Sequence, residues 1–270
     1  MAIKLVAIDI DGTLVDDHKR ISLKTKEAIK KAKQKGVYIV LCTGRPVSGI
    51  QDYLNELELS SDNDYAITYN GAQGENIGQK KIVFANLLSQ SDYQELLQIS
   101  KQAHVRSQIV TADSKLYTID ANISPYTVMD AFYTKMPLYY RSSEELTCTN
   151  AAKFMLVDEP AVLDEAMKYF DAELCQKYYT VRSEEWFFEF MHKKANKGQA
   201  VLELAHKLGI KDSQILALGD QNNDLTMIEL AGLGVAMGNA NETVKKAADA
   251  ITSDNNHDGV AMAIEKYVLN

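Results

Sequence analysis

Two aspartates stand two residues apart directly after an apolar run near the start of the chain. Asp9 and Asp11 follow residues 5–8 and precede Gly12. In an extended chain, residues i and i+2 point to the same side, so both carboxylates would leave a strand together. Two negative charges this close need a cation or a shared proton. A nucleophilic carboxylate on a metal ion, beside a second carboxylate that works as acid and base, would meet that need.

The same residues taken alone would also fit an ordinary polar turn after a strand, so the rest of the chain has to decide. Further polar side chains follow other apolar runs. Thr43 and Gly44 follow residues 37–42, and a second acidic cluster follows residues 215–218. That cluster contains Asp220, Asn223 and Asp224. Because sites in open parallel sheets form at the carboxyl ends of the strands, we expect these groups to meet at one edge.

Lys197 adds a cation to this predicted edge. It lies in the first turn of a predicted helix that Asn196 would cap. The helix dipole disfavours a cation at that end, so the position favours a functional role over a structural one. Mg²⁺ prefers carboxylate, carbonyl and water oxygens. Phosphoryl oxygens need cations and hydrogen-bond donors. The combined set therefore predicts Mg²⁺-assisted phosphoryl transfer.

The elements that position these groups follow an α/β pattern. Buried strands are expected at residues 5–8, 37–42 and 65–69, with helices between them. Strands and helices alternating in this order predict a parallel sheet with right-handed crossovers. From residue 196 the pattern resumes with a helix and the strand at 215–218.

The alternation of buried strands and helices stops near residue 84, where short predicted strands and helices in a mixed order follow. We expect two domains, a core of residues 1–84 and 190–270 and a mixed α+β insert of residues 85–189. The third predicted strand of the core ends in Asn70.

Composition narrows the class of protein. The chain has 270 residues, is 46% hydrophobic and carries a formal net charge of −8, which disfavours nucleic acid or an acidic membrane as a general partner. Three scattered cysteines suit a reducing compartment. The sequence has no run long enough to span a bilayer. We expect a cytoplasmic enzyme for a small molecule, either a monomer or a small homo-oligomer.

Four segments in order resemble the motifs of the haloacid dehalogenase superfamily. They are Asp9-Ile-Asp-Gly-Thr, Leu41-Cys-Thr-Gly-Arg, Asn196-Lys-Gly and Gly219-Asp-x-x-Asn-Asp. With Asn70-Gly-Ala and the insert, the chain is similar to the Cof-type subfamily with a type IIB cap. The segment that begins at Asp258 and the sequence pattern of the insert look closest to those of the YidA-type sugar phosphatases.

The resemblance implies a role for each matching residue. Asp9 would be the nucleophile that forms an aspartyl-phosphate, and Asp11 would be the general acid and base. Mg²⁺ would lie on Asp9, the Asp11 backbone carbonyl and Asp220, with Asp224 orienting its ligands. Phosphate binding falls to residues that supply donors: Gly12, Thr43, Gly44, Lys197 and Asn223. Arg45 and Asn70 would be neighbours of the substrate.

The resemblance favours an Mg²⁺-dependent phosphatase for small phosphomonoesters, with sugar phosphates first, and two alternatives stay open. A sugar phosphomutase uses the same aspartyl-phosphate but returns the phosphoryl group to the sugar. A non-enzymatic phosphate-ligand sensor would keep the pocket, although the complete acid/base and metal sets argue against it. A transport-ATPase domain is disfavoured because that family has Thr at the position of Asp11.

Overall fold

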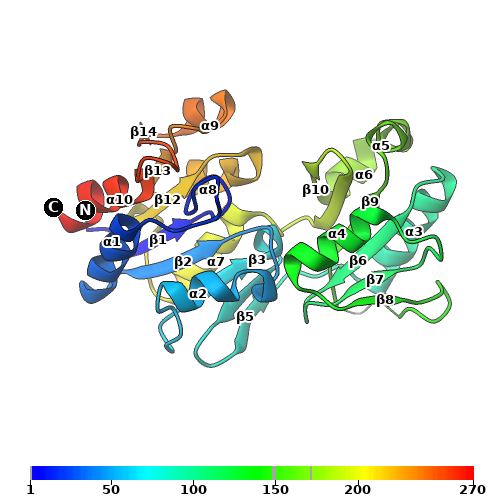
Figure 1. Ribbon diagram of the computed structural model, residues 1–270, viewed down its shortest axis with the longest axis horizontal. Helices are drawn as coiled ribbons and strands as arrows, with labels where there is room; N and C mark the ends of the chain where they lie inside the picture. The colour runs from blue at the N-terminus through cyan, green and yellow to red at the C-terminus, as the bar shows by residue number, and fades with distance from the viewer. Residues whose placement is uncertain (1, 148–149, 171) are drawn as a thin grey trace. The chain divides into compact units, whose positions relative to one another are not determined.

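A computed structural model describes residues 2–147, 150–170 and 172–270 of the chain (Figure 1). The described chain divides into two units. The core unit comprises Met1–Gly44, Ile50–Ala85 and Asn196–Asn270, and the insert unit comprises Arg45–Gly49 and Asn86–Ala195. Among the described residues, no helix is long and apolar enough to cross a membrane.

The core unit is built on an eight-stranded sheet in the order β14-β13-β12-β1-β2-β3-β4-β5. The strands from β14 to β3 are parallel, whereas β4 and β5 add an antiparallel hairpin at one edge. The strands are β1 (Leu5–Ile8), β2 (Tyr38–Cys42), β3 (Tyr65–Thr68), β4 (Gln73–Asn76), β5 (Lys81–Ala85), β12 (Ile215–Gly219), β13 (Leu233–Ala236) and β14 (Ala250–Ile251).

The helices of the core unit connect these strands. They are α1 (Leu23–Gln34), α2 (Gln51–Glu56), α7 (Lys197–Lys207), α8 (Leu225–Leu230), α9 (Glu242–Ala247) and α10 (Gly259–Ile264). Short 3-10 turns and one terminal π-turn complete the unit: η2 (Tyr69–Gly71), η4 (Asp212–Gln214), η5 (Asn222–Asp224) and η6 (Glu265–Leu269). The predicted N-cap at Asn196 is confirmed, because its side chain accepts a hydrogen bond from the first turn of α7. The side chain of Ser22 caps α1 in the same way.

Strand β1 lies between β12 and β2, and its register determines which residues leave the sheet together. Ile8 is paired with Leu218 on one side and with Leu41 on the other. The residues that follow these three therefore emerge at one edge. All four residues of β1 are fully buried, as expected for a central parallel strand.

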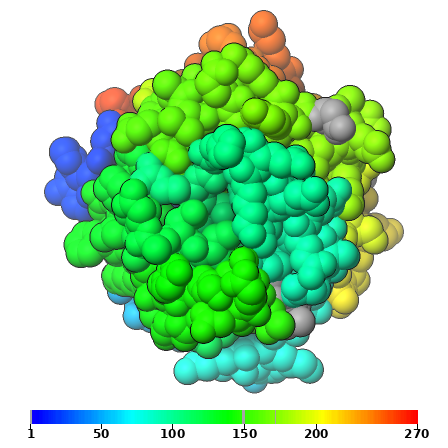
Figure 2. Space-filling model, turned by 90° about the vertical axis from the view of Figure 1, so that its right-hand side faces the viewer, coloured from blue at the N-terminus to red at the C-terminus, as the bar shows by residue number. Residues whose placement is uncertain are grey.

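The insert unit has its own six-stranded sheet in the order β10-β11-β9-β6-β7-β8, antiparallel except for the β7–β8 pair. Its strands are β6 (Ser107–Thr111), β7 (Leu116–Thr118), β8 (Leu138–Tyr140), β9 (Ala151–Val157), β10 (Tyr178–Glu184) and β11 (Phe187–His192). Its helices are α3 (Gln90–Gln102), α4 (Pro125–Thr134), α5 (Pro160–Ala166) and α6 (Ala172–Lys177), with 3-10 turns η1 (Val47–Gly49) and η3 (Met167–Tyr169). Figure 2 shows one face of this unit, where the first half of the insert, in blue-green, lies beside the later half, in yellow-green.

One element of the core unit differs from the sequence interpretation. The β4–β5 hairpin was not expected, because β4 has the sequence Gln-Gly-Glu-Asn and contains no apolar side chain. Strand β11 pairs with β10 through His192 and with β9 through Phe190. Of the cysteines, Cys42 is buried and Cys175 is exposed, both without a disulfide, and Cys148 lies outside the described residues.

We predict that the core of the insert unit depends on Phe154. This side chain is 1% exposed and packs among the aromatic rings of the unit, whereas Phe132 in the same unit is 77% exposed. Phe154→Ala should lower the free energy of unfolding by about 3–5 kcal/mol because it leaves a cavity. Phe132→Ala, the matched control, should change it by less than about 0.5 kcal/mol. Denaturant titration followed by circular dichroism measures both, and equal effects would contradict the assigned packing.

Candidate active site

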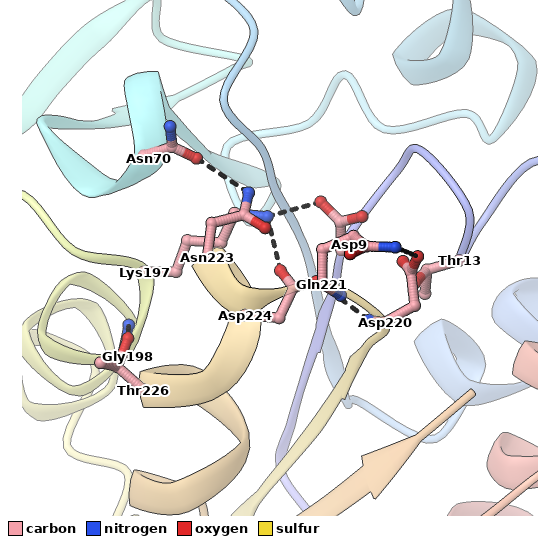
Figure 3. A network of polar contacts seen from close by, with 10 residues as sticks. All are labelled: Asp9, Thr13, Asn70, Lys197, Gly198, Asp220, Gln221, Asn223, Asp224 and Thr226. Carbon is pink, nitrogen blue, oxygen red and sulfur yellow. Dashed lines mark hydrogen bonds and ion pairs between the residues drawn. The ribbon is translucent and has the colours of Figure 1, made fainter. Parts of the chain in front are cut away.

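Lys197 is a fully buried cation placed between two carboxylates (Figure 3). Its Nζ atom lies 2.6 Å from Asp9 Oδ1 and 2.6 Å from Asp224 Oδ1. Asp9 follows β1, Asp224 ends the turn after β12, and Lys197 is the first residue of α7. Three segments far apart in the sequence therefore meet at one charged contact.

The start of α7 is fixed in place against α8. The backbone N–H of Gly198 donates to Thr226 Oγ1 at 3.1 Å. A Cβ atom on Gly198 would lie 2.3 Å from the Thr226 carbonyl oxygen, so only glycine permits this approach. The close packing holds the backbone of Lys197 at a depth from which its side chain reaches both carboxylates.

Burial and charge act together on these groups. Burial, followed by the like charge of Asp224, raises the pKa of Asp9 well above its usual range, although Lys197 opposes the shift. Burial alone would lower the pKa of Lys197, but Asp224 and Asp9 outweigh it, and the lysine pKa is raised. Lys197 is therefore a permanent cation that neutralises one of its two carboxylate neighbours.

Asp220 brings a third carboxylate to the same edge. Thr13 Oγ1 donates to its Oδ1 atom at 2.7 Å, and Gln221 Nε2 donates to its Oδ2 atom at 3.2 Å. Burial raises the pKa of Asp220 to about 6, against the hydrogen bond from Thr13. One lysine facing three carboxylates leaves an excess of negative charge at this point.

Asp224 also organises the turn that carries Asp220. Its Oδ2 atom accepts hydrogen bonds from the backbone N–H groups of Asp220 at 2.9 Å and Gln221 at 3.0 Å. A Cβ atom on Gly219 would lie 2.5 Å from the Asp224 Cβ atom, so the turn folds back directly on this side chain. Asp224 thus positions both the turn and Lys197.

The three carboxylates fit a divalent cation. One oxygen from each of Asp9, Asp220 and Asp224 lies within 4.8 Å of the others, and all three residues are buried. Oxygen donors and an excess of negative charge suit Mg²⁺ better than softer metals. A bound cation would favour the ionised form of Asp220, whose pKa burial raises.

A second polar group lies beside this cluster and joins the predicted phosphate-binding residues. Asn70 is buried in a left-handed conformation with φ 55° and ψ 30°. Its backbone N–H donates to the Thr43 carbonyl at 2.9 Å, and its Oδ1 atom accepts from Asn223 Nδ2 at 3.2 Å. A Cβ atom on Gly44 would lie 3.0 Å from Asn70 Oδ1. Asn70 therefore connects the end of β2 with the turn after β12.

Two of the predicted site residues, Asp11 and Arg45, make contacts outside the cluster around Lys197. The Asp11 carboxylate is part-exposed and pairs with Lys19, whose Nζ atom lies 2.7 Å from Oδ1. Arg45 belongs to the insert unit, where its guanidinium donates to the Gly49 carbonyl at 3.4 Å. The roles of both residues stay predictions.

Two residues that contact Asp220, Thr13 and Gln221, were not among the predicted site residues. Thr13 stood within the first motif, and its place one residue after Gly12 could have suggested a hydroxyl donor. Gln221 had no such signal, because nothing in its neighbours distinguishes it from any polar turn residue. Its backbone and side-chain contacts become apparent only in the folded turn.

Comparison with known proteins decides the family. A family model described as haloacid dehalogenase-like hydrolase matches residues 6–264. The chain belongs to this family. A Streptococcus pyogenes protein, named provisionally as a phosphatase, is 40% identical over 270 residues and covers 100% of both chains. The chain is accordingly an enzyme of the phosphoric monoester hydrolase class.

Solved structures agree with this membership. The crystal structure of a haloacid dehalogenase-like hydrolase from Bacteroides thetaiotaomicron is 33% identical, with a TM-score of 0.86 over 98% of this chain and 99% of that one. A sugar phosphatase of haloacid dehalogenase subclass IIB is 26% identical, with a TM-score of 0.77 over 98% of each chain. These findings confirm the predicted fold class, a parallel α/β core with an inserted α+β cap of type IIB.

We predict that Gly12 cannot carry a side chain without loss of activity. It has φ +80°, and a Cβ atom there would lie 2.5 Å from Asp220 Oδ2. Gly12→Ala should therefore displace the Asp220 carboxylate and lower phosphatase kcat/KM by about tenfold or more. Gly36 has φ +78° with nothing within 4 Å of the added atom. Gly36→Ala should cost about 1–2 kcal/mol of stability and leave kcat/KM unchanged. Equal activity losses in the two variants would refute the steric explanation.

Proposed function

We propose that the chain hydrolyses small phosphomonoesters, with sugar phosphates as the first candidates, through an aspartyl-phosphate formed on Asp9 with the help of Mg²⁺. The observation that carries this proposal is the contact of Lys197 with Asp9 and Asp224 beside the Asp220 carboxylate. It combines a fixed nucleophile, a permanent cation and an acidic site for a metal ion.

In the first half-reaction the Asp9 carboxylate attacks phosphorus, and the bond from phosphorus to the ester oxygen breaks. The departing alkoxide is a poor leaving group unless it receives a proton, which Asp11 would supply. Lys197 neutralises part of the charge on the phosphoryl oxygens. Thr43, Gly44 and Asn223, together with the backbone at Gly12, would hold those oxygens in line with Asp9.

In the second half-reaction water attacks the phosphorus of the aspartyl-phosphate and releases inorganic phosphate. Asp11, now ionised, would take the proton from the attacking water. The returned Asp9 carboxylate regains its contact with Lys197. Bound Mg²⁺, held by Asp9, the Asp11 carbonyl and Asp220, would neutralise charge on the phosphoryl oxygens throughout.

The substrate proposal rests on one structurally similar protein. The structurally similar subclass IIB protein is named a sugar phosphatase. We infer a cytoplasmic enzyme for small sugar phosphates, with Arg45 and Asn70 near the substrate, that works as a monomer or small homo-oligomer. A sugar phosphomutase would share the aspartyl-phosphate and would yield an isomerised sugar phosphate in place of free phosphate. A phosphate-release screen over sugar phosphates, nucleotides and pyridoxal phosphate, ranked by kcat/KM, tests both points.

We predict that Asp9→Asn removes turnover and leaves the fold intact. The amide oxygen can still accept the hydrogen bond from Lys197, but an amide is a poor nucleophile. The loss in kcat should be on the order of 10⁴ or more. Acid quenching with a radiolabelled substrate should trap a phosphorylated wild-type chain and leave Asp9→Asn unlabelled. Asp62→Asn, a matched change at an exposed carboxyl, serves as the control. Substantial turnover by folded Asp9→Asn would remove Asp9 from the mechanism.

We predict that Mg²⁺ stabilises the protein more at pH 7.5 than at pH 5. The pKa of Asp220 is raised to about 6 in the folded protein, against about 4 in an unfolded chain. Its protonated form therefore contributes stability to the metal-free protein that is fully present below about pH 4. That contribution is lost as the pH rises through 6. Mg²⁺ must displace the proton at pH 5 but not at pH 7.5. The melting temperature should rise by about 2–4 °C for each kcal/mol of binding free energy.

Thermal unfolding with excess Mg²⁺ or with a chelator measures this difference. Ca²⁺ should restore the activity of chelated enzyme poorly because it prefers a larger and looser set of ligands. In Asp220→Asn the Mg²⁺-dependent shift should be strongly reduced at both pH values. Full activity of a metal-stripped wild-type sample would contradict the metal assignment.

A further inference from the structure

A loop of residues 10–20, here called the Asp11 loop, is tied to two segments near the end of the chain. Asn239, between β13 and α9, donates from Nδ2 to the Gly12 carbonyl at 2.8 Å. Asn255, between β14 and α10, donates from Nδ2 to the Val15 carbonyl and to Asp17 Oδ1, both at 3.1 Å. The backbone N–H of Asn255 in turn donates to Asn239 Oδ1 at 3.0 Å, so the two asparagines act as one connected pair.

These ties end on the backbone around Asp11. Gly12 is the next residue along the chain, and Val15 forms an isolated β-bridge with Asp11. The hydrogen bonds of the asparagine pair therefore hold the chain on both sides of the bridge in which Asp11 takes part. Within the described part of the chain, neither asparagine forms a hydrogen bond with Asp9, Asp220, Asp224 or Lys197.

The far end of the Asp11 loop holds the Asp11 side chain. Asp16 Oδ1 accepts hydrogen bonds from the backbone N–H groups of His18 and Arg20, both at 2.9 Å. The tight turn places Lys19 in a left-handed conformation with φ 60° and brings its Nζ atom to 2.7 Å from Asp11 Oδ1. The loop thus determines both the backbone and the carboxylate position of Asp11.

We propose that Asn239 and Asn255 are positioning residues for Asp11, through which they set the efficiency of proton transfer to the leaving group. This inference rests on the proposed function, in which Asp11 is the general acid. Proton transfer in a transition state requires the acid within hydrogen-bond reach of the leaving oxygen, so a loop that shifts by a fraction of an ångström loses rate. Asn239 is exposed and Asn255 is half-buried, so neither is needed to fill the core.

A purely structural role for the pair makes a different prediction. If the asparagines only stabilised the fold, their loss would lower the melting temperature and would scale all substrates equally. A positioning role makes the loss depend on the leaving group, because a sugar alkoxide needs a proton and p-nitrophenolate does not. The dependence on leaving group therefore separates the two roles.

The experiment compares Asn239→Ala and Asn255→Ala with wild type in single turnover, using glucose 6-phosphate and p-nitrophenyl phosphate at saturating Mg²⁺. The rate of phosphoryl transfer from glucose 6-phosphate should fall by about tenfold or more, and that from p-nitrophenyl phosphate by less than about threefold. Asn63→Ala, which removes the amide of an exposed asparagine away from the Asp11 loop, should leave both rates unchanged. If glucose 6-phosphate proves a poor substrate, the best sugar phosphate from the phosphate-release screen replaces it.

Asp11→Asn serves as the benchmark that separates the inference from the proposed function. If Asp11→Asn loses rate selectively on the sugar phosphate while both asparagine variants, folded by circular dichroism, lose equally on the two substrates, the positioning role is wrong and the proposed function stands. If Asp11→Asn itself loses equally on both substrates, Asp11 is not the general acid, and the proposed mechanism and this inference fall together. Selective losses in Asp11→Asn and in either asparagine variant support the inference.

Discussion

The site depends on one lysine that is buried completely and faces carboxylates on two sides. Burying an ammonium group is costly unless it is paired, and here Asp9 and Asp224 each lie 2.6 Å from it. Removing one partner of such a group typically costs about 3–5 kcal/mol, since the remaining charge stays buried. The contact therefore ties β1, the turn after β12 and the start of α7 into one unit, and it leaves Asp9 oriented and partly neutralised.

The arrangement around Lys197 follows from the sheet. The register of β1 against β12 and β2 brings Asp9, the Asp220 turn and Thr43 to the same edge. Glycines permit the close approaches that this crowding requires: Gly12 lies against Asp220, and Gly198 lies against α8. This crowding buries neighbouring carboxylates, and burial, followed by the like charge of Asp224, raises the pKa values of Asp9 and Asp220. A divalent cation would neutralise the negative charge of the three carboxylates, which suits the site to phosphoryl transfer.

Much of this could be predicted from the sequence because the signals were local. The buried strand at residues 5–8, the Asn196 cap and the polar residues at strand ends each follow from residue types at fixed spacings. Contacts that depend on tertiary approach could not be predicted in this way. The pairing of Asp11 with Lys19 requires the turn at Asp16, and the ties from Asn239 and Asn255 join residues more than 200 positions apart. Strand β4, with the sequence Gln-Gly-Glu-Asn, has no apolar side chain that would have marked it as a strand.

The central claim is that the phosphoryl group passes through Asp9 in two displacements. The most direct test is the stereochemical course at phosphorus. A phosphorothioate ester made chiral with ¹⁶O and ¹⁸O would be hydrolysed in H₂¹⁷O, and the configuration of the inorganic thiophosphate determined. Each in-line displacement inverts the configuration at phosphorus, so attack by Asp9 followed by attack of water predicts net retention. Net inversion would mean that water attacks the ester directly and that Asp9 only holds the charge of the site.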